Sequence, residues 1–231
     1  MYTLYIANKN YSSWSLRPWV LMTELGIPFE EKLQVFSDDG NWDEFRKFSP
    51  TGLVPCLADG DTVVWESLAI VEYLGEKHAH LWPEDPSARS WARSATCEMH
   101  AGFSALRNRC SMTCGQRIKM HKPEEDDLRR DLDRLDELWG QGIEKFGGPF
   151  LAGDRFTAVD AFYCPVAFRV QSFGLKLNPI SMDYVKKLLS LDAMQFWYEQ
   201  ALVEPWREIA HEEEIAKSGE VYADFRKPLT S

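Results

Sequence analysis

The chain has 231 residues, 45% of them hydrophobic and 27% charged, which is the balance of a globular protein and not of a disordered one. Its formal net charge of −10 argues against a nucleic-acid partner, because proteins that bind phosphate backbones usually carry a basic face. A small anionic ligand remains compatible with this charge, since a local positive patch can coexist with an acidic whole.

Cysteine usage and hydropathy predict where the protein resides. Residues 1–8 lack a basic leader and a long apolar stretch, and the longest apolar runs, such as residues 19–22, are too short to span a bilayer. The cysteines are odd in number and scattered, which is typical of reduced thiols and not of a disulfide framework. We therefore expect a soluble cytoplasmic protein with no membrane partner. Its cysteines are Cys56, Cys97, Cys110, Cys114 and Cys164.

The first third of the chain alternates between strand and helix patterns. Residues 16–25 place apolar side chains near helical period until Gly26 ends the helix. The expected elements are a strand at 3–7, a helix at 16–25, a strand at 29–36, a short helix at 43–48, two hairpin strands at 55–58 and 62–65, and a helix at 67–78. This order predicts an α/β domain over residues 1–81 that mixes parallel and antiparallel pairing.

A break follows at residues 82–86, where two prolines in Trp-Pro-Glu-Asp-Pro cannot continue a helix and predict a linker. Strand patterns then fade, and residues 87–231 are predicted to form an all-helical domain. Within it, Thr157 and Asp160 stand as the N-cap and N3 residues of a capping box. Helices are expected at 87–120, 123–146, 154–169, 182–189 and 193–214.

The segment Leu53-Val54-Pro55-Cys56 is a first candidate for ligand binding. A proline donates no ladder hydrogen bond, so at the start of a strand it marks an edge or a turn. If the Val54–Pro55 bond is cis, the backbone N–H and C=O of Val54 face outward and can bind an extended peptide as an added strand does. The alternative is a loop proline without function, which the local sequence alone favours.

Glu66 and Ser67 stand where a predicted strand meets a predicted helix. Ser67 suits an N-cap or first-turn position, where free backbone N–H groups and the helix dipole attract a carboxylate. Glu66 is placed to pair with a ligand amine. A plain helix cap explains the same residues, and locally it is the simpler interpretation.

Ser12, Ser13 and Ser15 surround Trp14 between the first strand and the first helix. Three hydroxyls at a helix start usually only cap the helix. The functional alternative is a hydroxyl that donates to a ligand thiolate, which together with the helix dipole lowers a thiol pKa from about 8.5 toward neutrality. Arg17 is placed either to hold a ligand carboxylate or to form a structural salt bridge.

The order and spacing of these features resemble the glutathione transferases. The serine-rich turn, residues 49–55 (Ser-Pro-Thr-Gly-Leu-Val-Pro) and Glu66-Ser67 follow one another as in the family's thioredoxin-like N-terminal domain. Residues 12–17 (Ser-Ser-Trp-Ser-Leu-Arg) look most like the Ser-Ser-Cys-Ser-x-Arg motif of the zeta class, which includes maleylacetoacetate isomerases. Residues 150–160 resemble the family's signature entry to the central buried helix of an all-helical C-terminal domain.

The resemblance implies a homodimer that uses glutathione as co-substrate, activates its thiol with a serine hydroxyl and conjugates it to an electrophilic small molecule. Ser12 aligns with the activating serine, and Ser13, one residue away, is the runner-up. The implied glutathione-binding residues are Ser12, Ser13, Trp14, Val54, Pro55, Glu66 and Ser67. The implied substrate-pocket residues are Trp14, Met99, Phe103 and Arg107, with Met112 near them.

Two departures from the zeta pattern leave alternatives open. Trp14 stands where that class has a cysteine, and Leu53 replaces the polar residue usual before Val-Pro. A glutathione-dependent isomerase of maleylacetoacetate type and a non-catalytic glutathione-transferase-like binding module are therefore retained as alternatives. No metal site is predicted, because Cys110 and Cys114, four apart on a predicted helix, lack a nearby His or Cys pair at zinc spacing.

Overall fold

The computed structural model describes residues 1–38, 40–123 and 125–228 of the chain. Its N-terminal elements are β1 (Tyr2–Ile6), α1 (Ser13–Glu24), β2 (Phe29–Leu33), α2 (Trp42–Phe45), β3 (Cys56–Asp59), β4 (Thr62–Trp65) and α3 (Ser67–Gly75). The strands form one sheet in the order β2-β1-β3-β4, with β1 parallel to β2 and antiparallel to β3. This is the mixed α/β arrangement that the sequence predicts.

The C-terminal elements are mainly helices arranged around α7. They are α4 (Pro86–Ala101), α5 (Ser104–Arg109), β5 (Gln116–Met120), α6 (Asp126–Phe146), α7 (Ala158–Phe173), α8 (Pro179–Leu189), α9 (Asp192–Val203), α10 (Ile209–Ser218) and β6 (Gly219–Asp224). Helix α7 is buried along nearly its whole length, because α1, α4 and α8 pack around it. Thr157 and Asp160 form both hydrogen bonds of the predicted capping box at its start.

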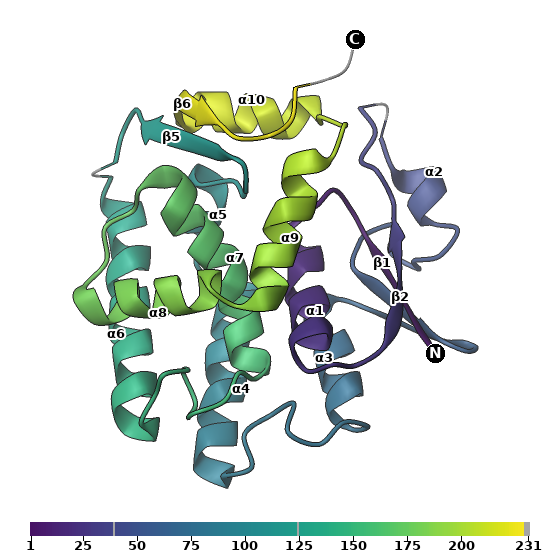
Figure 1. The fold of residues 1–231 in the computed structure, drawn as a ribbon, viewed down its shortest axis with the longest axis vertical. Coiled ribbons are helices and arrows are strands. Elements are labelled where there is room, and N and C mark those ends of the chain that lie inside the picture. The colour runs from purple at the N-terminus through teal and green to yellow at the C-terminus, as the bar shows by residue number, and fades with distance from the viewer. Residues whose placement is uncertain (39, 124, 229–231) are drawn as a thin grey trace.

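Helix α1 lies in the middle of the molecule, between the sheet and the C-terminal helices (Figure 1). It contacts α3 of its own domain and both α7 and α9 of the helical part. Every residue from Ser15 to Met22 is therefore buried, whereas a helix with one solvent face shows a single apolar stripe. The serine-rich turn at the start of α1 is thereby held between the two parts of the chain.

The predicted helix over residues 87–120 is wrong beyond residue 101. Gly102 ends α4, and a Cβ atom at this position would lie only 2.7 Å from the carbonyl oxygen of Glu98. After the short helix α5, residues 116–120 form strand β5, which pairs antiparallel with β6. The C-terminal domain is therefore helical with one added two-stranded sheet. Because the two strands come from distant parts of the chain, no local hairpin pattern reveals them.

Two further expectations for the helical domain also need correction. The predicted helix over 193–214 is divided into α9 and α10, with Pro205 in the irregular segment between them. Cys110 and Cys114 do not share a helix, because Cys110 ends α5 and Cys114 lies in the loop that follows. Both thiols are buried, and burial raises the pKa of Cys110 to about 12.

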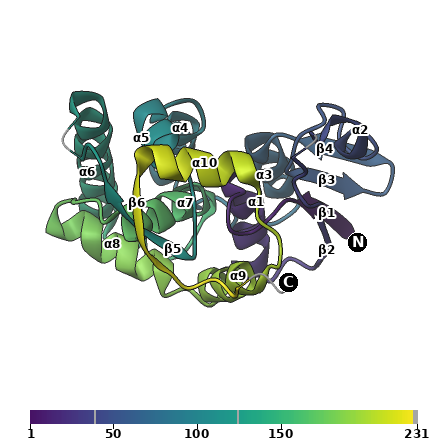
Figure 2. The same cartoon turned by 90° about the horizontal axis from the view of Figure 1, so that it is seen from above.

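The C-terminal segment crosses over the junction of the two parts. Seen from above, α10 runs across the molecule from the side of α5 toward the side of α3 (Figure 2). The buried guanidinium of Arg226 pairs with Glu212 of α10 at 2.5 Å and with Asp224 of β6 at 2.6 Å. Tyr11, which precedes the serine pair, donates a hydrogen bond to Glu212 at 2.5 Å. The segment is thus tied to the loop that carries the serines.

Candidate functional site

Two adjoining cavities lie beside the start of α1. One has a volume of about 430 Å³ and the other about 290 Å³, and Trp14, Leu53 and Val54 line both of them. The structure therefore brings together three segments that are far apart in the sequence. The predicted site residues that line one cavity or the other are Ser12, Ser13, Trp14, Val54, Pro55, Glu66 and Arg107.

The serine-rich turn is built by hydrogen bonds among its own residues. Ser12 is the N-cap residue of α1, yet its side chain makes no capping bond to the helix backbone. Its hydroxyl donates to the Ser15 hydroxyl at 2.8 Å, and Ser15 accepts a second bond from the Ala7 backbone N–H at 3.2 Å. These bonds hold the turn against the end of β1. Ser12 and Ser13 both line the larger cavity, at the N-terminus of a helix whose dipole favours a negative charge.

The Val54–Pro55 peptide bond is cis, which is the geometry considered from the sequence. Val54 lines both cavities and therefore lies where they adjoin. Leu53 beside it is 59% exposed, and Pro55 lines the smaller cavity. A backbone N–H and C=O at such a position are suited to an extended peptide ligand.

Glu66 lines the smaller cavity, and Ser67 follows it in the chain without lining either cavity. Glu66 lines the cavity with a positive φ of 69°, a conformation that non-glycine residues rarely adopt and that occurs more often at binding sites. Ser67 is the first residue of α3 and is fully buried. Its hydroxyl has no hydrogen-bond partner among the residues that the structure describes. A hydroxyl without a partner at a helix N-terminus is suited to donate a hydrogen bond to a ligand carboxylate.

Three arginines from three helices surround Trp14 and Ser13. Arg17 of α1 is 1% exposed and stacks on the Trp14 ring at 3.9 Å from its centroid, with Arg107 of α5 at 5.4 Å from the same ring. Arg169 of α7 is 4% exposed and donates to the Ser13 hydroxyl at 3.3 Å. The Nε and Nη1 atoms of Arg17 and the Nε atom of Arg107 have no partner within the described part of the chain.

These arginines create a local positive field in an acidic protein. Burial, then the charges of Arg169 and Arg107, lowers the pKa of Arg17. Burial likewise lowers the pKa of Arg169 to about 10, a value at which the side chain is still protonated at neutral pH. Within the described residues none of the three forms an ion pair with a carboxylate. Charged side chains are rarely buried without a counter-charge, so the site is suited to an anion.

The structure brings only some of the predicted substrate-pocket residues to the cavities. Trp14 and Arg107 line the larger cavity, and so does Met112. Met99 and Phe103, by contrast, are 0% and 6% exposed, belong to the hydrophobic core and line neither cavity. Their helical spacing is the same for a core face as for a pocket wall, so the sequence could not separate the two.

Several residues that line the larger cavity were missed from the sequence. Arg169 was detectable in principle, because it is the single charged residue in α7 after Asp160 and a lone charge in an apolar helix marks a special environment. The remaining missed residues have no local pattern that distinguishes them from surface positions. They are Phe36, Asn41, Phe45, Asn108, Ser111 and His211.

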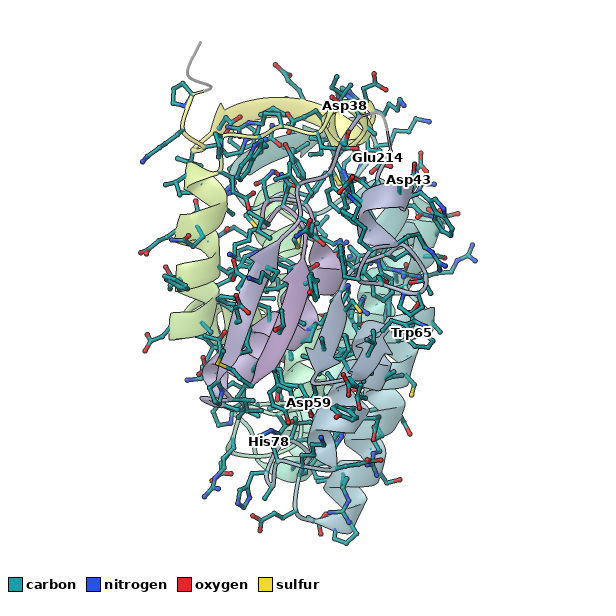
Figure 3. All side chains as sticks on the ribbon, turned by 90° about the vertical axis from the view of Figure 1, so that its right-hand side faces the viewer. Asp38, Asp43, Asp59, Trp65, His78 and Glu214 are labelled. Atoms are coloured by element: carbon teal, nitrogen blue, oxygen red, sulfur yellow. The ribbon has the colours of Figure 1, made fainter. Side chains whose placement is uncertain are left out.

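His211 brings helix α10 to the cavity. Its ring stacks on Tyr11 with centroids 5.1 Å apart, and its Nδ1 atom lies 2.7 Å from the Glu208 carboxylate. The N-terminus of α10 is fixed to the loop after β2, where the Ile209 N–H donates to Asp38 at 3.1 Å. Figure 3 labels Asp38 and Glu214 of α10 close to each other, above the sheet. The C-terminal segment therefore contributes His211 to the lining of the larger cavity.

Across residues 1–38, 40–123 and 125–228, no group of three His, Cys, Asp or Glu side chains is arranged to hold a metal ion. Over the same residues, none of the helices combines the length and hydrophobicity needed to cross a membrane.

The fold and the cavity at its domain junction define a class of two-domain proteins, in which a thioredoxin-like α/β domain precedes a helical one. Residues 11–77 match the glutathione S-transferase N-terminal domain, and residues 119–186 match the glutathione S-transferase C-terminal domain. Together these matches cover more than half of the chain. The protein belongs to the glutathione S-transferase family, and the fold expected from the sequence is confirmed.

Known relatives include both transferases and isomerases. The chain is 27% identical over 206 residues to glutathione S-transferase GstB of Escherichia coli K12, covering 80% of this chain and 88% of that protein. It is 26% identical over 200 residues to maleylacetoacetate isomerase of Rattus norvegicus, covering 83% and 89%. The crystal structure of maleylacetoacetate isomerase from Methylobacterium extorquens AM1, with bound malonate and glutathione, matches with a TM-score of 0.63 at 25% identity, covering 85% of this chain and 95% of that one.

Proposed function

We propose that the protein is a glutathione transferase that activates the glutathione thiol with a serine hydroxyl and transfers it to an electrophilic small molecule. The observation that carries this proposal is the pair of adjoining cavities: Ser12 and Ser13 line the larger one, Glu66 lines the smaller one, and Val54 lines both.

Each part of glutathione has a complementary group along the cavities. Ser67 and the N-terminus of α3 bind the α-carboxylate of the γ-glutamyl end, and Glu66 pairs with its amine. The Val54 backbone pairs with the backbone of the cysteinyl residue. The thiol then enters the larger cavity beside the serine pair at the start of α1.

The chemistry begins with loss of the thiol proton to water. A free thiol has a pKa of about 8.5, and a serine hydrogen bond, the N-terminus of α1 and the arginine field all favour the thiolate. The thiolate sulfur then forms a bond to an electrophilic carbon. In a substitution, the leaving group departs with its bonding electron pair. In an addition across a double bond, water protonates the neighbouring carbon. The larger cavity holds the electrophile.

The direct test combines binding with turnover. Calorimetric titration with glutathione should give saturable binding, and a chromogenic aryl halide should be conjugated by the wild type. Replacing both serines, Ser12→Ala with Ser13→Ala, should lower kcat/KM by about 100-fold or more with a much smaller loss of glutathione affinity. Binding without conjugation of any electrophile tried would favour the alternative of a non-catalytic binding module.

A second candidate function is a glutathione-dependent isomerase of maleylacetoacetate type. The arginine cluster favours it, because the Arg107 side chain lines the larger cavity and a guanidinium is suited to bind a substrate carboxylate. Two of the relatives described above carry the name maleylacetoacetate isomerase.

The two functions differ in their dependence on substrate charge. Arg107→Gln should lower kcat/KM for a carboxylate-bearing electrophile by about 10- to 100-fold and leave a neutral electrophile little affected. Arg109→Gln is the matched control on the same helix, since Arg109 pairs with Glu125 and Asp127 away from the cavity. An equal loss for both substrates would indicate that Arg107 only supports the structure.

We also propose that the protein is a cytoplasmic homodimer that serves in detoxification. The five cysteines are free thiols in the structure, which is consistent with a reducing compartment. Light scattering coupled to gel filtration measures the mass in solution, and a monomer at micromolar concentration would contradict the assembly. Cell fractionation tests the compartment.

A further inference from the structure

The two candidate hydroxyls differ in how their protons are used. A serine hydroxyl has one proton to donate and two lone pairs to accept with. The Ser12 hydroxyl donates its proton to Ser15 at 2.8 Å, within the turn. The Ser13 hydroxyl instead accepts a bond from Arg169 at 3.3 Å, and among the described residues its own proton has no acceptor. Only Ser13 therefore keeps a proton free for a ligand in the cavity.

Arg169 is itself held firmly in position. Its Nε donates to the Cys110 carbonyl at 2.8 Å and its Nη1 to the Pro165 carbonyl at 3.3 Å. The remaining Nη2 faces Ser13, and the planar guanidinium fixes this third direction relative to the other two. The side chain lies in the buried central helix, so it has little freedom to turn away.

An arginine in this position acts on the hydroxyl in two ways. By donating to a lone pair of the Ser13 oxygen, it turns the hydroxyl proton away from itself, and the larger cavity is lined by both residues. A hydroxyl that accepts a bond from a cation is also polarised and becomes a stronger donor. In addition, the guanidinium charge favours an anion at the hydroxyl.

We propose that Ser13 is the hydroxyl that donates to the glutathione sulfur and that Arg169 of the helical domain is its positioning residue. The proposal rests on the proposed function, because it assigns a role within the same glutathione site. It makes thiol activation depend on the docking of the two domains, since Ser13 and Arg169 are 156 residues apart in the sequence.

Other groups near Arg169 do not provide an alternative partner for the sulfur. Arg107 of α5 acts on both Arg169 and Arg17 of α1, and Glu66 acts on Arg17 with the opposite charge. Cys110 and Cys114 are buried thiols near the Arg169 guanidinium. Burial raises the pKa of both thiols, so they remain neutral. His211 of α10 lines the same cavity and is bonded to Glu208.

The test measures the thiol pKa of bound glutathione, from the ultraviolet absorbance of the thiolate as a function of pH, separately from glutathione affinity by calorimetry. Ser13→Ala should raise this pKa by about one unit or more, which leaves roughly tenfold less thiolate at neutral pH. Arg169→Gln should give a similar rise in this pKa. Arg169→Lys should give a smaller rise, because a lysine keeps the positive charge but lacks the planar guanidinium with its fixed N–H directions. Ser181→Ala, in α8, is the control for removing a buried hydroxyl.

A double variant distinguishes positioning from a general structural effect. If Arg169 acts through Ser13, the double variant Ser13→Ala with Arg169→Lys should raise the pKa by less than the sum of the single rises. Should Arg169→Gln fail to fold, Ser13→Ala and the lysine variant carry the test. Additive rises, or an unchanged thiol pKa in both arginine variants that fold, would overturn the role of Arg169.

The same measurements separate this proposal from the proposed function. A larger rise in thiol pKa for Ser12→Ala than for Ser13→Ala would overturn the assignment of Ser13 and leave the glutathione transferase function standing. A wild-type protein that does not bind glutathione, or binds it with the thiol pKa of free glutathione, would overturn both.

Discussion

Ser67 and Ser181 are both fully buried, and neither hydroxyl has a hydrogen-bond partner within the described residues. Neither serine lines a cavity, but Ser67 directly follows Glu66, which lines the smaller one, whereas Ser181 lies in α8. A buried hydroxyl without a partner is costly, so one beside a cavity indicates a ligand group that completes it. The two serines allow a binding effect to be separated from a packing effect.

At this scale, Ser67→Ala is expected to lower glutathione affinity about tenfold, because a hydrogen bond to a charged ligand group contributes about 1.5 kcal/mol. The melting temperature of the unliganded protein should change little, since the hydroxyl has no protein partner to lose. Calorimetric titration measures the affinity. Ser181→Ala should leave it unchanged, and a similar loss in both variants would contradict a contact between Ser67 and the ligand.

At the scale of a structural element, the start of α7 depends on one carboxylate. Asp160 accepts hydrogen bonds from the backbone N–H groups of Leu151 and Thr157 at 3.0 and 2.9 Å. Tyr184 of α8 donates a further bond at 2.9 Å, so Asp160 joins the helix start to two neighbouring segments. Burial raises the pKa of Asp160 to about 6, although these hydrogen bonds act in the opposite direction.

This shift predicts a pH-dependent contribution to stability. An unfolded aspartate has a pKa of about 3.9, so the native state binds the Asp160 proton more tightly. The stabilisation from this proton is complete below about pH 4 and is lost as the pH rises through about 6. Asp160→Asn cannot ionise. The stability advantage of the wild type over this variant should therefore fall by on the order of 3 kcal/mol between about pH 4 and about pH 7.

Urea unfolding of the wild type and Asp160→Asn at the two pH values measures this difference. A stability difference that does not change with pH would show that Asp160 has an ordinary pKa in the folded protein.

The start of α7 and the pairing of β5 with β6 differ in how far they could be predicted from the sequence. The capping box at Thr157 and Asp160 was predictable, because its hydrogen bonds join residues only three apart. Strand β5 was not, because its partner β6 lies about a hundred residues later and β pairing is favourable only once the chain has brought both together.

At the scale of the whole molecule, the two domains share one continuous hydrophobic core. Polar contacts across the junction are buried as well. The Asn10 side-chain oxygen accepts bonds from the backbone N–H groups of Cys114 and Gly115 at 3.0 and 3.1 Å, and Trp197 donates to the Lys9 carbonyl at 2.9 Å. Because these contacts join the two domains, we expect the two domains to unfold in one transition.

This expectation is tested by urea unfolding followed by tryptophan fluorescence and far-ultraviolet circular dichroism, whose transitions should coincide. Asn10→Ala should lower the free energy of unfolding by about 2–4 kcal/mol, since it leaves two buried N–H groups unpaired. Two separate transitions in the wild type would contradict a shared core.

The sequence by itself determined the features that depend on neighbouring residues. These are the order of strands and helices in the first domain, the capping box and the three short motifs at Ser12–Ser13, Val54–Pro55 and Glu66–Ser67. Local backbone preferences and hydrophobic periodicity act over a few residues, so they can be recognised without the fold.

Only the tertiary structure decided which residues meet in the cavity and how their protons are used. The sequence ranked Ser12 ahead of Ser13, whereas in the structure the Ser12 proton is bound to Ser15 and Arg169 reaches Ser13 from the other domain. Met99 and Phe103, in turn, are buried in the core. The physical reason is that burial and side-chain hydrogen bonds depend on how helices distant in the chain pack together, which residue spacing along one helix does not record.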